Sequence, residues 1–145
     1  MDKRLPLAML GILSLFLIAA CGSTTATSEP PTPTAMDTEA EYRTLDIEDL
    51  ANILENNPDA YTIINVHIPY AGEIEGTDEN IAFNDLDALT AAIPNRDTPV
   101  ILYCRSGNMS EQASRALVEL GYTQVWDVPG GMIAWEDSGR ALIND

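Results

Sequence analysis

The sequence predicts an α/β domain with a central parallel sheet flanked by helices on both faces. From residue 42 onward, short segments rich in β-branched and aromatic residues alternate with segments whose apolar residues recur at helical spacing. The most apolar segment, Val100–Tyr103, has no polar alternation and suits a strand buried on both faces. A chain of 145 residues has room for one such domain.

The first half of the domain alternates strand and helix. Residues 42–45 predict a short strand, and Asp46 suits the N-cap of a helix that runs to about Asn56. Residues 57–59, Asn-Pro-Asp, end this helix, and the apolar residues 61–66 predict a buried strand. A polar connection over residues 68–80 follows, and loops of this length in compact domains are often functional.

The second half continues the alternation. Residues 81–83 predict a brief strand, and residues 85–93 a helix that Pro94 closes. Val100–Tyr103 predicts the innermost strand, and a helix then starts near Ser110 and stops at Gly121. Its inward residues are expected to be Ala113, Ala116, Leu117 and Leu120. Residues 125–128 predict a strand, residues 130–131 a tight turn, and residues 132–138 a short closing helix.

The composition excludes several classes of function. Lys and Arg number 7 against 23 Asp and Glu, a formal charge of −16, whereas nucleic-acid binding and adhesion to anionic lipid both depend on clustered cations. Two cysteines and one histidine are too few for a disulfide framework or an ordinary structural zinc site. We therefore expect no nucleic-acid partner, no metal and no cofactor.

The N-terminus predicts export. Lys3 and Arg4 precede an apolar run over residues 5–20, which is short for a membrane-spanning helix and typical of a signal peptide. Ile-Ala-Ala followed by Cys21 resembles the lipobox of bacterial lipoproteins, in which the cysteine is acylated and becomes the new N-terminus. This resemblance implies an extracytoplasmic lipoprotein anchored to the cell membrane through Cys21. The alternative is an ordinary signal peptide or an uncleaved anchor with an incidental cysteine.

Three segments therefore divide the chain. We expect a lipoprotein signal peptide over residues 1–20, an acylated cysteine with a disordered Ser/Thr/Pro-rich tether over residues 21–41, and a globular domain over residues 42–145. Cleavage before Cys21 would remove two basic residues and one acidic residue, and would change the formal charge from −16 to −17.

Residues 104–110, Cys-Arg-Ser-Gly-Asn-Met-Ser, carry the chemistry of the domain. A parallel strand delivers Cys104 to the carboxyl edge of the sheet, where open α/β sheets bind ligands. A six-residue turn with Gly107 and Asn108 can point its amides inward as an anion-binding nest before the helix near Ser110. These amides, the helix dipole and Arg105 all favour the thiolate, which is the nucleophilic form. The alternative is that Cys104 is a small buried hydrophobic residue.

This segment resembles the cysteine loop of single-domain rhodanese-like sulfurtransferases. The resemblance spans residues 42–139 and includes Gly-Tyr at 121–122, Gly-Gly-Met at 130–132 and Trp135. It implies that Cys104 takes a sulfane sulfur from a donor, holds it as a persulfide and passes it to a thiol or to cyanide. By the same resemblance, the loop binds substrate through Arg105, Ser106, Gly107, Asn108, Met109 and Ser110.

The chain departs from the common family pattern near this site. Asn65-Val66-His67 stands where many members have Asp-Val-Arg, and we expect Asn65 and His67 to lie behind the residues that contact substrate. We expect His67 to be a structural hydrogen-bonding residue, and the alternative is that it acts as a general base. Met109 stands where active members often carry a basic residue. A chain with a formal charge of −17 would also repel anions, so we expect a neutral, persulfide-type or protein-bound donor rather than thiosulfate.

Two other functions fit parts of the pattern. Cysteine phosphatases need an arginine six positions after the nucleophile to hold phosphate, and that position here is Ser110. A catalytically weak or inactive module that binds a partner or senses redox state through Cys104 is the non-enzymatic alternative, because the departures lie near the active site.

Overall fold

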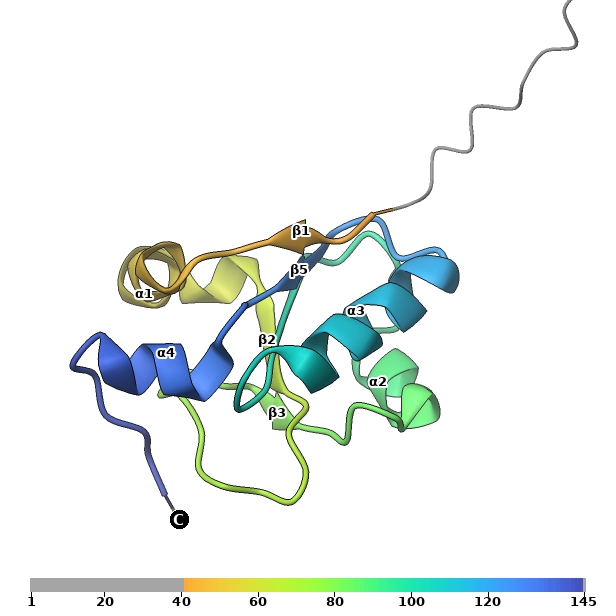
Figure 1. Ribbon diagram of the computed structural model, residues 1–145. Helices are drawn as coiled ribbons and strands as arrows, with labels where there is room; N and C mark the ends of the chain where they lie inside the picture. Colours follow the sequence, from red (N-terminus) through yellow and green to blue (C-terminus); the bar gives the residue numbers. More distant parts are fainter. Residues whose placement is uncertain (1–40, 145) are drawn as a thin grey trace, which may run out of the picture. The chain divides into compact units, whose positions relative to one another are not determined.

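A computed structural model describes residues 41–144 of the chain. The expected signal peptide, Cys21 and the tether lie outside the described residues, as does Asp145. The described residues form one parallel sheet in the order β1-β5-β4-β2-β3 (Figure 1). Its strands are Arg43–Thr44 (β1), Thr62–Asn65 (β2), Glu79–Asn80 (β3), Val100–Tyr103 (β4) and Val125–Asp127 (β5). As the apolar run predicts, β4 is the central strand.

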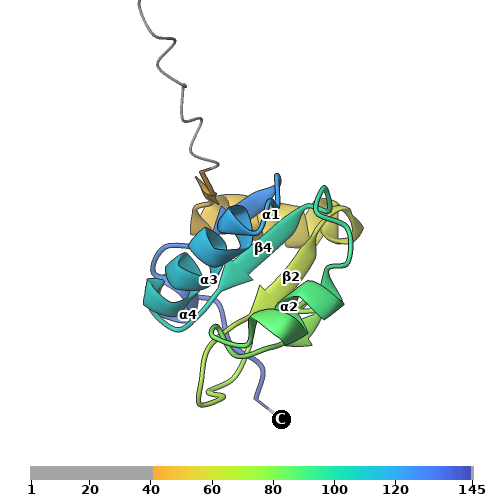
Figure 2. The same cartoon turned by 90° about the vertical axis from the view of Figure 1, so that its right-hand side faces the viewer.

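Helices cover both faces of the sheet, which confirms the predicted fold class. They are α1 (Ile47–Asn56), α2 (Leu86–Ala92), α3 (Asn108–Glu119) and α4 (Gly131–Asp137), with a 3₁₀ turn, η1, over Pro58–Ala60. Figure 2 shows α2 and α3 over the near face of β2 and β4, and α1 and α4 lie on the other face. The side chain of Asp46 accepts the amide of Asp49 and so caps α1, as expected.

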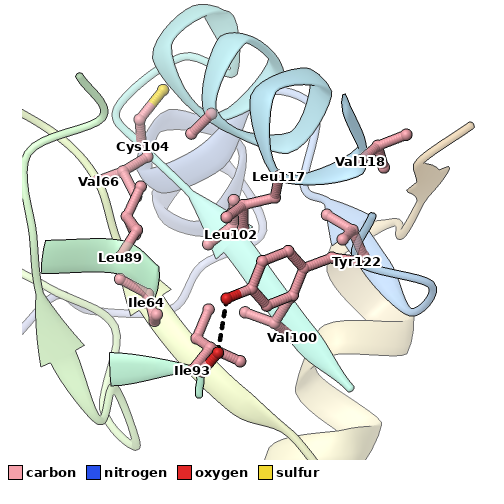
Figure 3. Close-up of a cluster of buried hydrophobic side chains, with 12 residues drawn as sticks. Ile64, Val66, Leu89, Ile93, Val100, Leu102, Cys104, Leu117, Val118 and Tyr122 are labelled. Carbon is pink, nitrogen blue, oxygen red and sulfur yellow. Dashed lines mark hydrogen bonds between the residues drawn. The ribbon is translucent and has the colours of Figure 1, made fainter. Parts of the chain in front are cut away.

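Each face of the sheet has its own apolar core. The α2–α3 core packs alternate residues of β2, β4 and β5 against Leu89, Ala113 and Leu117 (Figure 3). The opposite core packs Ile101 and Tyr103 of β4 against residues of α1 and α4. Because successive strand residues point to opposite faces, β4 contributes side chains to both cores and is buried along its whole length.

Two predicted element positions were wrong. The strand at residues 81–83 is instead β3, over two exposed polar residues without apolar alternation. The amides of Ile81 and Phe83 continue its hydrogen bonding to Asn65 of β2 and to Val66 just after it, but their side chains turn onto the α2–α3 core. Helix α3 begins at Asn108, two residues before Ser110, because Gly107 caps it through a left-handed backbone without any side-chain bond.

One predicted inward residue is also wrong. Leu120 is 40% exposed, because α3 ends at Glu119 and Leu120 serves as its C-cap. Ala116 is partly buried, while Ser114 and Val118 take buried places on the inner face of the helix. Within residues 41–144, no helix has both the length and the apolar character to cross a membrane.

Candidate active site

Strand β4 ends one residue before Cys104 and sets this cysteine at the carboxyl edge of the sheet. The residue is 1% exposed, and its Sγ accepts a hydrogen bond from the amide of Gly107 at 3.1 Å. The Ser110 hydroxyl lies 3.7 Å from the same sulfur. Figure 3 shows the sulfur at the end of the α2–α3 core, directed away from Val66 and Leu89. The sulfur is thus held by the loop and by the first turn of α3.

Gly107 sets the tight turn between Cys104 and α3. Its φ is +95°, a left-handed conformation that residues with a Cβ seldom adopt. A Cβ at this position would also lie 3.0 Å from the amide nitrogen of Gly130 and 3.4 Å from Cα of Pro129. The loop is therefore four residues long rather than six, and it packs closely against the turn before α4.

The start of α4 anchors the loop from its other side. The amide of Met132 donates to the carbonyl of Cys104 at 2.9 Å, and that of Ile133 to the carbonyl of Arg105 at 3.0 Å. Gly131 permits this approach, because a Cβ there would lie 1.9 Å from the Cys104 oxygen. The sequence indicated residues 130–131 only as a turn. A Gly-Gly pair one strand after the cysteine is the signal that could have indicated this close approach.

The loop leaves several amides without partners. In the hydrogen bonding of residues 41–144, none of the amides of Arg105, Ser106, Asn108 and Met109 acts as a donor. Asn108 and Met109 occupy the first turn of α3, where the helix has unsatisfied amides and the positive end of its dipole. These donors suit a second, negatively charged sulfur atom held next to Cys104.

The side chains of the expected substrate loop divide into two groups. Arg105, Ser106 and Asn108 are exposed, whereas Ser110 is fully buried and donates from its hydroxyl to the Gly107 carbonyl at 3.1 Å. Met109 is partly buried and packs against the α2–α3 core. The only formal charge among these residues, on Arg105, thus lies at the outer surface of the loop.

Within the described residues, neither Asn65 nor His67 hydrogen-bonds the Cys104 sulfur. The buried Asn65 side chain donates to the Gly72 carbonyl at 3.2 Å and accepts the His67 amide at 3.1 Å, so it fixes the chain as it leaves β2. Burial, and then the nearby Arg105 charge, lowers the pKa of His67 below its usual 6.5. His67 is therefore a neutral imidazole at pH 7, close to Arg105.

The sequence profile of the Rhodanese-like domain family matches residues 36–138. The chain belongs to this family. A sulfurtransferase of Allochromatium vinosum is 42% identical over 48 residues, which cover 33% of this chain and 45% of that protein. The thiosulfate sulfurtransferase GlpE of Pseudomonas fluorescens is 35% identical over 74 residues, covering 51% of this chain and 66% of that protein. Across four such relatives, the chain spans between 18% and 66% of their length.

Solved structures share the rhodanese-like fold. A rhodanese-related protein of Thermoplasma volcanium has a TM-score of 0.58 at 29% identity, over 72% of this chain and 100% of that one. A rhodanese-like domain from Anabaena has a TM-score of 0.63 at 22% identity, over 72% and 81%. A Rhodopseudomonas palustris protein described as a possible tyrosine phosphatase also has a TM-score of 0.63, but at 20% identity it shows the shared fold alone.

Proposed function

We propose that this rhodanese-like protein is a sulfurtransferase that carries sulfane sulfur as a persulfide on Cys104. The observation that carries the proposal is the setting of the sulfur: Sγ accepts the Gly107 amide at 3.1 Å and adjoins the N-terminal turn of α3. Such a setting stabilises negative charge on sulfur, both on the attacking thiolate and on the persulfide that forms. Relatives named as sulfurtransferases support this chemistry.

The proposed reaction has two displacements at sulfur. The Cys104 thiolate attacks the outer sulfur of a donor persulfide, a bond from Sγ to that sulfur forms, and the donor's S–S bond breaks to release the donor thiolate. The thiolate of an acceptor then attacks the same outer sulfur, and Cys104 leaves as a thiolate. The donor thiol and the acceptor persulfide are the products, so no external oxidant or reductant is needed.

The donor is proposed to be a neutral, persulfide-type or protein-bound sulfur compound. Met109 brings no charge to the loop, and the Arg105 side chain is exposed at its outer surface. The full chain has a formal charge of −16, which disfavours the approach of a small dianion such as thiosulfate. The acceptor lies outside the chain, since Cys104 is the only cysteine after residue 21 and has no resolving partner in the domain.

A mass measurement tests the proposed persulfide. The protein should gain about 32 Da on the peptide that carries Cys104 after treatment with a sulfane donor, and lose this mass on addition of a thiol acceptor. The Cys104→Ala variant should gain nothing and show no sulfur transfer. The absence of the adduct with thiosulfate, glutathione persulfide and a protein persulfide would support the rival binding or redox-sensing module.

A charge substitution tests the choice of donor. Met109→Arg should raise thiosulfate turnover by roughly tenfold, because a cation in the first turn of α3 attracts the donor. Met109→Gln is the matched control, since it also removes the apolar side chain but adds no charge. Equal turnover in the two variants would show that charge at this position does not limit the use of thiosulfate.

We also propose that the protein acts outside the cytoplasm, tethered to the cell membrane by acylated Cys21. The support is the basic n-region, the apolar run and the Ile-Ala-Ala-Cys sequence at residues 18–21. In cell fractionation the protein should sediment with membranes, and Cys21→Ser should release it. A variant that stays bound to membranes would contradict the lipid anchor without affecting the proposed chemistry.

A phosphatase function is not favoured by the site. The arginine that such enzymes use to hold phosphate would stand at position 110. Ser110 is buried there, and its hydroxyl is engaged by the Gly107 carbonyl and lies next to Cys104 Sγ.

A further inference from the structure

A buried carboxyl group lies behind the cysteine loop. Asp127, the last residue of β5, is 4% exposed. Because side chains alternate along a strand and Val125 packs in the α2–α3 core, Asp127 points to the same side, toward α3. Its Oδ1 is buried and has no hydrogen-bond partner within residues 41–144. An ionised carboxylate is costly to bury unless it is paired or hydrogen-bonded, so this site favours the protonated acid.

Ser110 connects this carboxyl group to the sulfur. The hydroxyl of Ser110 is fully buried, 3.7 Å from Cys104 Sγ and 3.1 Å from the Gly107 carbonyl. Asp127 faces the same turn of α3, close enough for a hydrogen bond from this hydroxyl to influence the pKa of its carboxyl group. Burial raises the pKa of Asp127 above its usual 3.8, and the hydrogen bond from Ser110 lowers it by a smaller amount.

The Ser110 hydroxyl has only one proton to donate. When Asp127 is ionised, its carboxylate is the strongest nearby acceptor and takes that proton, so the sulfur loses a donor. When Asp127 is protonated, the carboxyl group can donate to Ser110 Oγ, and the hydroxyl proton is left to the Gly107 carbonyl and the Cys104 sulfur, of which the thiolate is the stronger acceptor. The charge on Asp127 thus decides whether the Ser110 hydroxyl donates to the carboxylate or remains available to the Cys104 sulfur.

We infer that Asp127 is a positioning residue for Cys104 that acts through Ser110: in its protonated form it donates to Ser110 Oγ and directs the hydroxyl proton to the sulfur. The inference rests on the proposed function only in taking Cys104 as the reactive sulfur. It requires no particular sulfur donor or acceptor.

Charged groups around Asp127 come from two sides. Glu111 of α3 acts on Asp127 and opposes its ionisation, and Arg115 binds Glu111 at 2.8 Å. Tyr42, just before β1, interacts with Asp127 and hydrogen-bonds Glu111. Glu111 is therefore already paired with Arg115, and its charge favours the protonated form of Asp127.

The test compares the reactivity of Cys104 in the full chain as pH is varied. Iodoacetamide alkylation is followed on the peptide that carries Cys104, in the wild type and in Asp127→Asn, whose amide can donate to Ser110 at every pH. We expect equal rates at the lowest pH that the fold tolerates. As pH rises through the titration of Asp127, the variant should become about tenfold faster than the wild type, the effect of one charge-assisted hydrogen bond.

Two serine variants show whether the effect passes through Ser110. When both proteins also carry Ser110→Ala, the ratio of the Cys104 alkylation rate with Asp127→Asn to that with Asp127 should shrink to less than about threefold at high pH. Ser114→Ala is the matched control, because Ser114 is also buried, lies one turn later on α3, and its hydroxyl has no hydrogen-bond partner within residues 41–144. It should retain the full ratio. A ratio that does not change with pH, or that persists in Ser110→Ala, would overturn the inference.

A further comparison covers the case in which Asp127→Asn does not fold. Part of the alkylation rate of Cys104 in the wild type should then be lost as Asp127 ionises. The pH profile of this rate should therefore differ between the wild type and Ser110→Ala, and should be the same in the wild type and Ser114→Ala. Identical profiles for all three proteins would refute the role of Asp127. Because alkylation needs no sulfur donor, these results are independent of whether the persulfide of the proposed function forms.

Discussion

The close approach of α4 to the cysteine loop predicts a large effect for Gly131→Ala. A Cβ at this position would lie 1.9 Å from the carbonyl oxygen of Cys104, 2.8 Å from its carbonyl carbon and 3.2 Å from the carbonyl carbon of Arg105. All three atoms belong to the backbone and cannot rotate away. The loop and the helix must therefore separate by about 1 Å or more to reach an ordinary contact distance.

The free-energy cost follows from what this separation breaks. The hydrogen bonds from Met132 and Ile133 to the loop carbonyls are 2.9 and 3.0 Å long, and each contributes about 0.5–1.5 kcal/mol. The φ of Gly131 is +49°, and a left-handed residue with a Cβ costs roughly 1–2 kcal/mol. We expect Gly131→Ala to lower the free energy of unfolding by about 2–5 kcal/mol.

Gly139→Ala separates the clash from the backbone strain. Gly139 also has a positive φ, +86°, but a Cβ there would meet nothing within 4 Å. This variant should lose only the strain, roughly 1–2 kcal/mol, in urea unfolding followed by circular dichroism. Alkylation of Cys104 should change in Gly131→Ala and not in Gly139→Ala. Equal losses of stability in the two variants would refute the argument from the loop contact.

Two further substitutions test other parts of the site. The buried hydroxyl of Tyr103 accepts the Ile74 amide at 3.0 Å and bonds Thr77 at 2.6 Å, so Tyr103→Phe should cost about 1–3 kcal/mol in urea unfolding. Burial raises the pKa of Tyr103 to about 12, so its protonated form stabilises the fold fully below pH 10 and this contribution disappears as pH rises through 12. If the free energy of unfolding of Tyr103→Phe falls above pH 10 as much as that of the wild type, this reasoning is wrong. His67→Gln should change the yield of the Cys104 persulfide less than about threefold, since the imidazole is neutral and bonds no sulfur. Burial lowers the pKa of His67, so the stability that its neutral form contributes is complete above pH 6.5 and is lost as pH falls through the lower pKa of the folded protein. An NMR titration midpoint for His67 at or above 6.5 would show that this reasoning fails.

Much of the fold was predictable because its signals are local. The apolar run of β4, the N-cap at Asp46 and the helical spacing after Ser110 each lie within a few neighbouring residues. The start of α3 was predicted two residues late, because a glycine cap acts through backbone conformation and leaves no side-chain signature. Strand β3 was misplaced because a two-residue edge strand is too short for a pattern of alternation.

The candidate site was less predictable because part of it depends on distant contacts. The Cys104 loop is visible in sequence, whereas its anchoring by Met132 and Ile133 depends on how α4 packs against the end of β4. No role for Asp127 was predicted from the sequence, although its place two residues after the buried Val125 puts it on the same, core-facing side of the strand. The same alternation, read strictly along residues 125–127, could have found it.

The hydrogen bonds from α4 to the Cys104 loop also depend on the order in which the chain is synthesised. A ribosome adds Cys104 28 residues before Met132, whose amide holds the cysteine carbonyl. Until that last helix has been synthesised, the loop lacks both of its α4 donors, and the turn at Gly107 has no Pro129–Gly130 surface to pack against. An unfinished chain therefore lacks the geometry around its sulfur, and that geometry depends on completion of the domain.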